Sequence, residues 1–328
     1  MISSGSVGIT VWLFAVPLVV VGLLLTAPVS YLLAAARWTR RSPRPALVLW
    51  QAVCLAAGFS VVAGLVLLAA EPLGSTLPTA AFNWFGAVLT GTLRVPAWRL
   101  LCGLAAALLA AFLLIVLART ALLTVRRRRA HRQVLDLLTR PVDRGTGGRR
   151  FATGAQVRIL DHRAAVAYTL PGWHSRVVLS AGLVELLTEP ELAAVVQHER
   201  AHLRARHDLL VLPFQAWAVA LGWVPGVRPA GASVAELTEM LADDVAAGRT
   251  SRPTLASALA KVALAGPTSE PPPDRFADSP AIAGTAVADR VRRLLDPRPL
   301  SGWETAGVYV AAALLLTIPA SVLLVHWT

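Results

Sequence analysis

Four long apolar stretches constrain this chain more than any other feature of its sequence. They cover approximately residues 9–36, 46–70, 97–125 and 305–326. Each is long enough for a helix that crosses the hydrocarbon core of a bilayer, which needs about 20 residues. The first stretch lacks a basic leader and a small-residue cleavage site, so we interpret it as a retained anchor and not a signal peptide. We therefore predict four transmembrane helices.

The arginines that flank these stretches predict how the chain is oriented. Four arginines lie between the first two stretches and six lie at the end of the third, whereas residues 71–96 carry only Glu71 and Arg94 as charged residues. Basic residues are retained on the cytoplasmic side of a membrane. We therefore expect a multi-pass protein of the cell membrane whose N-terminus and C-terminus are extracytoplasmic. The expected divisions are three spans in residues 1–125, a cytoplasmic domain in 126–303 and the fourth span in 304–328.

Composition then excludes several classes of function. The formal net charge is +12, but most of the excess lies beside the apolar stretches, where it binds anionic lipid and sets topology. No basic face with interleaved aromatic residues is present, so we expect contact with the lipid bilayer and no direct binding of nucleic acid. Both cysteines, Cys54 and Cys102, lie in predicted spans. A thiolate zinc site or a cysteine nucleophile is therefore excluded from residues 126–303.

The region between the third and fourth spans predicts a mixed α+β domain. Residues 126–150 are basic and end in a glycine-rich run, which indicates a short helix and then a linker. The runs QVRIL, AAVAYTL and SRVVLS, separated by turn residues, predict a small antiparallel sheet. A capping box of Thr188 and Glu191 then begins a helix. The apolar segment 209–224 is too short to span, and we expect it to lie against the membrane face. Residues 266–278 indicate a proline-rich loop.

The helix that starts at Thr188 contains the motif that predicts the chemistry. His198-Glu199-Arg200-Ala201-His202 is an HExxH sequence. Two imidazoles four residues apart lie on one face of a helix and can bind one tetrahedral zinc ion. Glu199 is then the expected general base, because it can accept a proton from the attacking water.

A catalytic zinc site needs a third protein ligand, and two glutamates are candidates. Ser233 and Glu236 match a capping box, which gives Glu236 a structural role at a helix N-terminus. Glu239 lies one turn further along and is followed by Asp243. We predict that Glu239 binds the metal and that Asp243 accepts a hydrogen bond from the far nitrogen of a ligand histidine. Two acids on a solvated helix face remain the alternative.

The sequences VVQHERAHLRARHDLL and EMLADDVAA resemble the membrane-bound gluzincin peptidases. This group includes the HtpX-like and CAAX-prenyl-protease families, and the resemblance is greatest to the penicillinase antirepressor peptidases, the β-lactam sensor-transducers. It covers about half of the chain, from Tyr168 to Asp296. It implies an α-helical membrane protein with a cytoplasmic zincin domain, one Zn²⁺ per chain, Glu199 as general base and Glu239 as third ligand. The sensor-transducers also carry an extracytoplasmic penicillin-binding domain after the last span, and we expect no β-lactam binding by that route here.

We therefore predict a zinc endopeptidase that cleaves a protein or peptide substrate at the cytoplasmic face. A transcriptional repressor is one candidate substrate, misfolded membrane proteins are another, and a non-catalytic metal-binding scaffold is the rival class. A monomer and a homo-oligomer both fit the sequence. The strand at residues 177–180 is expected to hold an extended substrate. His207 is expected to face away from the metal, and His174, Arg249 and Arg290 remain equal candidates for stabilising the oxyanion.

Overall fold

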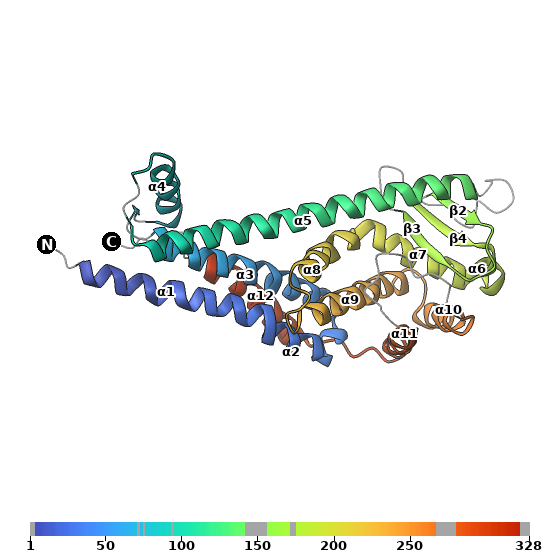
Figure 1. Ribbon diagram of the computed structural model, residues 1–328. Helices are drawn as coiled ribbons and strands as arrows, with labels where there is room; N and C mark the ends of the chain where they lie inside the picture. Colours follow the sequence, from blue (N-terminus) through green and yellow to red (C-terminus); the bar gives the residue numbers. More distant parts are fainter. Residues whose placement is uncertain are drawn as a thin grey trace.

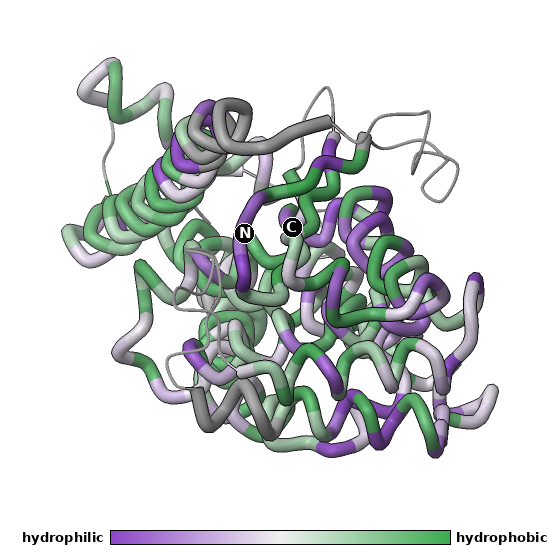
Figure 2. The backbone as a smooth tube through the Cα atoms, turned by 90° about the vertical axis from the view of Figure 1, so that its right-hand side faces the viewer, coloured by the Kyte–Doolittle hydropathy of each residue, from purple (hydrophilic) through white to green (hydrophobic). Residues whose placement is uncertain are grey.

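The computed structural model describes residues 4–70, 73–74, 76–92, 95–141, 156–170, 175–266 and 280–321. The molecule is elongated, with long apolar helices at one end and a small sheet with its covering helices at the other (Figure 1). Helices α8 and α9 lie between these two ends. Figure 2 faces the end that carries the sheet, where hydrophilic segments alternate with hydrophobic ones. His174 and all but the first residue of the predicted proline-rich loop fall outside the described residues.

Over the residues that the structure describes, all four predicted spans lie in helices, apart from Ala36 at the end of the first. The first consists of α1 (Ser4–Leu24), the π-helical turn η1 (Leu25–Val29) and α2 (Ser30–Ala35), and the others are α3 (Pro43–Ala70), α5 (Ala97–Leu138) and α12 (Gly302–Ser321). Segments Trp12–Ala35, Pro43–Ala69, Ala97–Arg127 and Gly302–Ser321 are long and apolar enough to cross a membrane. These four segments support a multi-pass membrane protein. The wide turn η1 contains Pro28, whose missing N–H interrupts the helical hydrogen bonds.

Helix α5 is longer than the sequence predicts. A short helix and a linker were expected after residue 125, but α5 continues unbroken for 42 residues to Leu138. Residues 126–138 contain no glycine or proline and are rich in arginine and leucine, which favour helix, so nothing in them ends the helix. At 1.5 Å per residue, α5 is roughly 60 Å long and runs along much of the molecule (Figure 1).

The sheet is mixed and not antiparallel, which corrects the prediction. Its described strands are β1 (Thr139–Pro141), β2 (Gln156–Leu160), β3 (Ala167–Leu170) and β4 (Arg176–Ser180), in the order β1-β2-β4-β3. Strand β4 pairs antiparallel with β3 on one side and parallel with β2 on the other, where Val157 lies opposite Val177. Because β4 lies between β2 and β3, it has no open edge on which a substrate strand could pair.

Helices cover this sheet and connect it to the spans. They are α6 (Ala181–Leu186), α7 (Glu189–Ala205), α8 (His207–Leu221), α9 (Val227–Ala247), α10 (Arg252–Leu264) and α11 (Pro280–Leu295), and α4 (Leu77–Leu89) lies at the opposite end of the molecule. The predicted capping box at the start of α7 is confirmed, because the backbone N–H of Thr188 donates to Glu191 Oε2 at 2.9 Å. Leu192, Val195 and Val196 of α7 share a buried cluster with Val177 and Leu179 of β4.

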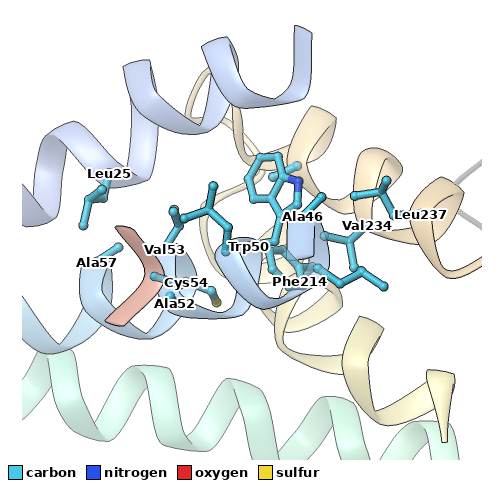
Figure 3. Packing of buried hydrophobic residues seen from close by; sticks show 14 of the residues in the cluster. Leu25, Ala46, Trp50, Ala52, Val53, Cys54, Ala57, Phe214, Val234 and Leu237 are labelled. Atoms are coloured by element: carbon cyan, nitrogen blue, oxygen red, sulfur yellow. The ribbon is translucent and has the colours of Figure 1, made fainter. Parts of the chain in front are cut away.

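The largest buried cluster joins the second span to helices α8 and α9 (Figure 3). Trp50 of α3 is fully buried against Phe214 of α8, with the two rings edge to face and their centroids 6.0 Å apart. Val234 and Leu237 of α9 belong to the same cluster. Helix α8, the short apolar segment of the sequence, therefore packs beside α3 and α9. This cluster fixes α9 relative to the membrane helices.

The turn between α8 and α9 also touches the first span. Gly226 has a φ of +96°, a conformation that L side chains rarely adopt, and a Cβ there would lie 2.6 Å from the carbonyl oxygen of Ala27. Only glycine satisfies both conditions. The start of α9 is thus placed directly against η1.

Candidate metal centre

Helix α7 brings the two histidines of the HExxH motif together. His198 Nε2 lies 3.2 Å from His202 Nε2. This closeness follows from the four-residue spacing, which puts both side chains on one face of the helix one turn apart. His198 is buried and His202 is partly buried, so the pair lies below the surface of the domain.

Helix α9 supplies a third donor. Glu239 Oε2 lies 3.4 Å from His198 Nε2, and Glu239 Oε1 lies 3.6 Å from His202 Nε2. Zinc bonds to nitrogen and oxygen are about 2.0–2.2 Å long, so ligand atoms around a tetrahedral zinc lie roughly 3.3–3.6 Å apart. The three separations, 3.2 Å between the two Nε2 atoms and 3.4 and 3.6 Å to the two oxygens of Glu239, lie within about 0.1 Å of that range. Across the described residues, His198, His202 and Glu239 form the group of at least three potential ligands whose donor atoms lie within 4.8 Å of one another.

Asp243 lies behind His198, one turn along α9 from Glu239. Its Oδ1 is 2.9 Å from His198 Nδ1, and the aspartate is fully buried. Burial alone would lower the pKa of His198, but contacts with the Asp243 and Glu239 carboxylates raise it to about 9. Because Asp243 approaches Nδ1, Nε2 of His198 is the nitrogen directed at the metal position.

Arg290 of α11 holds both carboxylates of α9. It donates from Nε and Nη2 to the two oxygens of Asp243 at 2.7 Å each, and Nη1 lies 3.2 Å from Glu239 Oε2. Burial by itself would raise the pKa of Asp243, but the charge of Arg290 lowers it to about 2. The same charge keeps the pKa of Glu239 well below its ordinary value despite burial. Arg290 therefore holds Asp243 and Glu239 in place and keeps both ionised, and it is not itself a metal ligand.

These contacts bear on the three candidates for oxyanion stabilisation. Arg290 is committed to Asp243 and Glu239, and Arg249 Nη1 donates to Gln197 Oε1 at 3.2 Å on the surface. His174 lies outside the described residues. From the sequence, Arg290 was only a candidate for oxyanion stabilisation. Its contacts with Asp243 and Glu239 could not be predicted, because Arg290 lies on another helix, 47 residues beyond Asp243.

His207 does not face away from the site, which corrects the prediction. Its Nδ1 lies 3.0 Å from Nδ1 of His202, and the side chain is buried. Arg206 adopts a left-handed conformation with a φ of 47°, which ends α7 and turns the chain back so that His207 begins α8. Burial and the neighbouring His202 lower the pKa of His207 to about 4. The Nδ1 of a neutral His207 can accept a hydrogen bond from His202 Nδ1–H, so His207 can orient His202 as Asp243 orients His198.

Glu236 has a different role from the predicted cap. Helix α9 begins at Val227, so Ser233 and Glu236 lie inside it and do not form a capping box at its start. Glu236 instead pairs with Arg40 of the loop between the first two spans, through contacts of 2.9 and 3.0 Å. The two competing glutamates thus point to different partners, Glu236 to the membrane side and Glu239 to the histidines.

Glu199 lies next to His198 on α7 and is partly buried. Its charge is among the causes that raise the pKa of Arg290, which is itself in contact with Glu239. Glu199 therefore belongs to the same electrostatic environment as the two histidines and the α9 carboxylates.

Comparison of the sequence with models of known protein families finds a match to one family. The model of peptidase family M48 matches residues 125–236, about a third of the chain. A search of curated proteins found no match. The matched region contains the HExxH motif and ends three residues before Glu239, so the family match does not include the third donor. Over the region that holds His198, Glu199 and His202, this chain is therefore similar to the M48 metallopeptidases.

Proposed function

We propose that this protein is a zinc-dependent endopeptidase anchored by four transmembrane helices and acting at the cytoplasmic face. The observation that carries the proposal is the convergence of His198, His202 and Glu239 at distances suited to tetrahedral zinc. The similarity to M48 peptidases over residues 125–236 supports the same chemistry. Two imidazoles and one carboxylate are the ligand set of a catalytic zinc that keeps one position open for water or substrate.

Each residue of the site has a distinct role in the proposed hydrolysis. Zinc bound there would polarise the scissile carbonyl and make water a stronger acid. Glu199 takes the proton of the attacking water and delivers it to the leaving amine. Asp243 and His207 hold the two ligand histidines in the correct tautomer, and Arg290 keeps the α9 carboxylates ionised.

The substrate strand has to be reassigned from β4. Strand β4 is paired on both sides, whereas β3 lies at the end of the sheet order and contacts α7. We therefore infer that an extended segment of the substrate pairs with β3, which brings its backbone alongside the helix that carries Glu199.

A cytoplasmic transcriptional repressor remains our proposed substrate class. Three spans before the peptidase domain and one after it resemble the arrangement of the sensor-transducers, and this favours signalling over general turnover of membrane proteins. A non-catalytic metal-binding scaffold is the rival reading. The two readings differ in what they require of Glu199, because a scaffold needs the metal ligands but no proton acceptor.

Replacing Glu199 tests the peptidase directly. Glu199→Gln keeps the side-chain volume but removes the proton acceptor, and loss of a general base costs about two to four orders of magnitude in rate. Purified wild type and variant would be compared for zinc content, for self-cleavage and for cleavage of labelled casein. Glu185→Gln is the matched control, since Glu185 is exposed on α6. Unchanged cleavage by Glu199→Gln would contradict the proposal, whereas cleavage lost with zinc retained would support it.

A further inference from the structure

A basic cavity lies where two candidate spans begin. Its volume is about 250 Å³, and its charged lining consists of Arg41, Arg44, Arg252, Arg293, Arg298 and Asp244. The remaining lining includes prolines just before α12 and at the start of α3. It is separate from the metal centre, because none of the donors at that centre contributes to its lining.

The positive charge of the cavity is only partly neutralised. Arg293 pairs with Asp244, the one acid in the lining, through contacts of 3.0 and 2.6 Å, and Arg298 pairs with Asp296 outside the lining at 2.7 Å. Arg41 donates to the backbone carbonyls of Arg298 and Pro299, which orient it without cancelling its charge. Within the described chain, no ion pair is recorded for Arg44 or Arg252, and both are exposed. Among the described residues, Arg44 and Arg252 thus present guanidinium groups to the cavity without an ion-pair partner.

The position of the cavity indicates which anion it meets. Pro43 and Arg44 are the first residues of the candidate span Pro43–Ala69, and Pro299 lies three residues before the span that begins at Gly302. The ends of spans lie at the level of the lipid headgroups, where anionic phospholipids attract basic side chains. Guanidinium groups bind phosphate through paired hydrogen bonds, and they do so better than lysine.

We propose that this cavity binds the phosphate of an anionic phospholipid headgroup. Its volume lies just below the range of about 300–1,000 Å³ typical of pockets for drug-sized ligands, which suits a headgroup phosphate more than a larger molecule. The proposal requires that the four helices lie in a bilayer, but it does not require peptidase activity.

A headgroup in the cavity would join four elements. Its lining comes from α3, α9, α10 and α11, and Asp244 and Arg293 are close in sequence to the site residues Asp243 and Arg290. Ligands that bind only the folded state stabilise it. The bound lipid would therefore tie the second span to the helices that brace the metal centre and raise the thermal stability of the whole chain.

The test is to measure lipid binding by the purified protein in detergent. Native mass spectrometry detects the bound lipid, and thermal unfolding measures the stabilisation that it gives. Phosphatidylglycerol, phosphatidylcholine and inorganic phosphate would be titrated separately. We expect phosphatidylglycerol to bind and to raise the unfolding temperature more than phosphatidylcholine. Loss of one arginine near a membrane surface weakens anionic binding about fivefold, so Arg44→Gln with Arg252→Gln should weaken it roughly 25-fold.

The matched control removes the same charge from another juxtamembrane site. Arg126→Gln with Arg129→Gln removes two exposed arginines of α5 outside the cavity and should weaken phosphatidylglycerol binding far less than the cavity variant does. An equal loss in both double variants would overturn the proposal, because attraction would then be a property of the general surface charge. Equal binding of both lipids would overturn it as well. Stabilisation by inorganic phosphate alone, with no added effect of lipid, would assign the cavity to a free phosphate and contradict a headgroup.

Discussion

The two ligand histidines are held from behind by different groups. Asp243 lies 2.9 Å from Nδ1 of His198, and His207 lies 3.0 Å from Nδ1 of His202. A carboxylate strengthens the basicity of its histidine more than a neutral imidazole does, so the two ligands are electronically unequal. Because the turn at Arg206 places His207, the orientation of His202 depends on the turn between α7 and α8.

Removing His207 should therefore weaken metal binding without removing a ligand. We expect His207→Ala to lower zinc affinity about 10-fold to 100-fold, the usual effect of losing a partner that orients a ligand. The measurement is a competition titration with a chelator of known affinity. His162→Ala is the control, because His162 is exposed and its Nδ1 accepts a hydrogen bond from Ala164. Equal zinc affinities in wild type and His207→Ala would rule out the orienting role.

The sequence could predict those residues of the site that depend on local spacing. Helix periodicity alone places His198 and His202 on one face, and it also places Asp243 one turn from Glu239. His207 was missed because its position depends on the left-handed Arg206, which no residue type at that position signals. Arg290 comes from a separate helix, so its contacts with α9 depend on tertiary packing.

The start of α7 is secured to α10 by a buried carboxylate. Glu191 accepts hydrogen bonds from Ser257 Oγ at 2.6 Å and from Lys261 Nζ at 2.7 Å, in addition to the backbone N–H of Thr188. Burial by itself would raise the pKa of Glu191, but these hydrogen bonds lower it from 4.5 to about 2. The interaction therefore stabilises the folded state only while Glu191 is ionised.

This pKa predicts how stability depends on pH. Because the pKa is lower in the folded state, the contribution of Glu191 is fully present above about pH 4.5 and is lost as the pH falls toward 2. We expect Glu191→Gln to lower the free energy of unfolding by roughly 2–3 kcal/mol near neutral pH. The difference from wild type should shrink between pH 4.5 and 2, as measured by thermal unfolding in detergent. A difference that stays constant over this window would show that Glu191 is not ionised in the fold.

Individual helices and strands could be predicted where a local sequence pattern marks them, but the pairing of the strands with one another could not. The capping box of Thr188 and Glu191 marks the start of α7 correctly. The three predicted strand runs contain β2, β3 and β4, but their order and direction depend on non-local pairing, which alternation of side chains does not encode. Strand β4 was consequently assigned to the substrate although β3 is at the edge.

At the scale of the whole molecule, α9 links the membrane helices to the metal centre. Leu237 packs in the cluster around Trp50, Glu236 pairs with Arg40, and Glu239 faces the histidines, all within four consecutive residues of one helix. The apolar runs of the sequence predict the four spans, but nothing in them predicts that α3 contacts α9. That interface combines residues about 180 positions apart and is visible only in the fold.

The arrangement of the helices supports a testable topology. The start of α1, helix α4 and the end of α12 lie at the end of the molecule opposite the sheet (Figure 1). With the arginine-rich ends of the spans inside, we expect reporter fusions after Arg44 and Arg150 to be cytoplasmic. Fusions after Ala80 and Thr328 should be external. A cytoplasmic reporter after Thr328 would contradict four spans with an external N-terminus.

The most direct test of the central claim is the zinc content of purified protein, measured by mass spectrometry of the metal. We expect about one zinc per chain in the wild type, and a sharp loss in His198→Ala and Glu239→Ala. Glu236→Ala is the matched control, because Glu236 lies on the same helix but pairs with Arg40 and should leave zinc content unchanged. Equal loss of zinc from Glu236→Ala and Glu239→Ala, or a wild type that binds no zinc, would contradict the account.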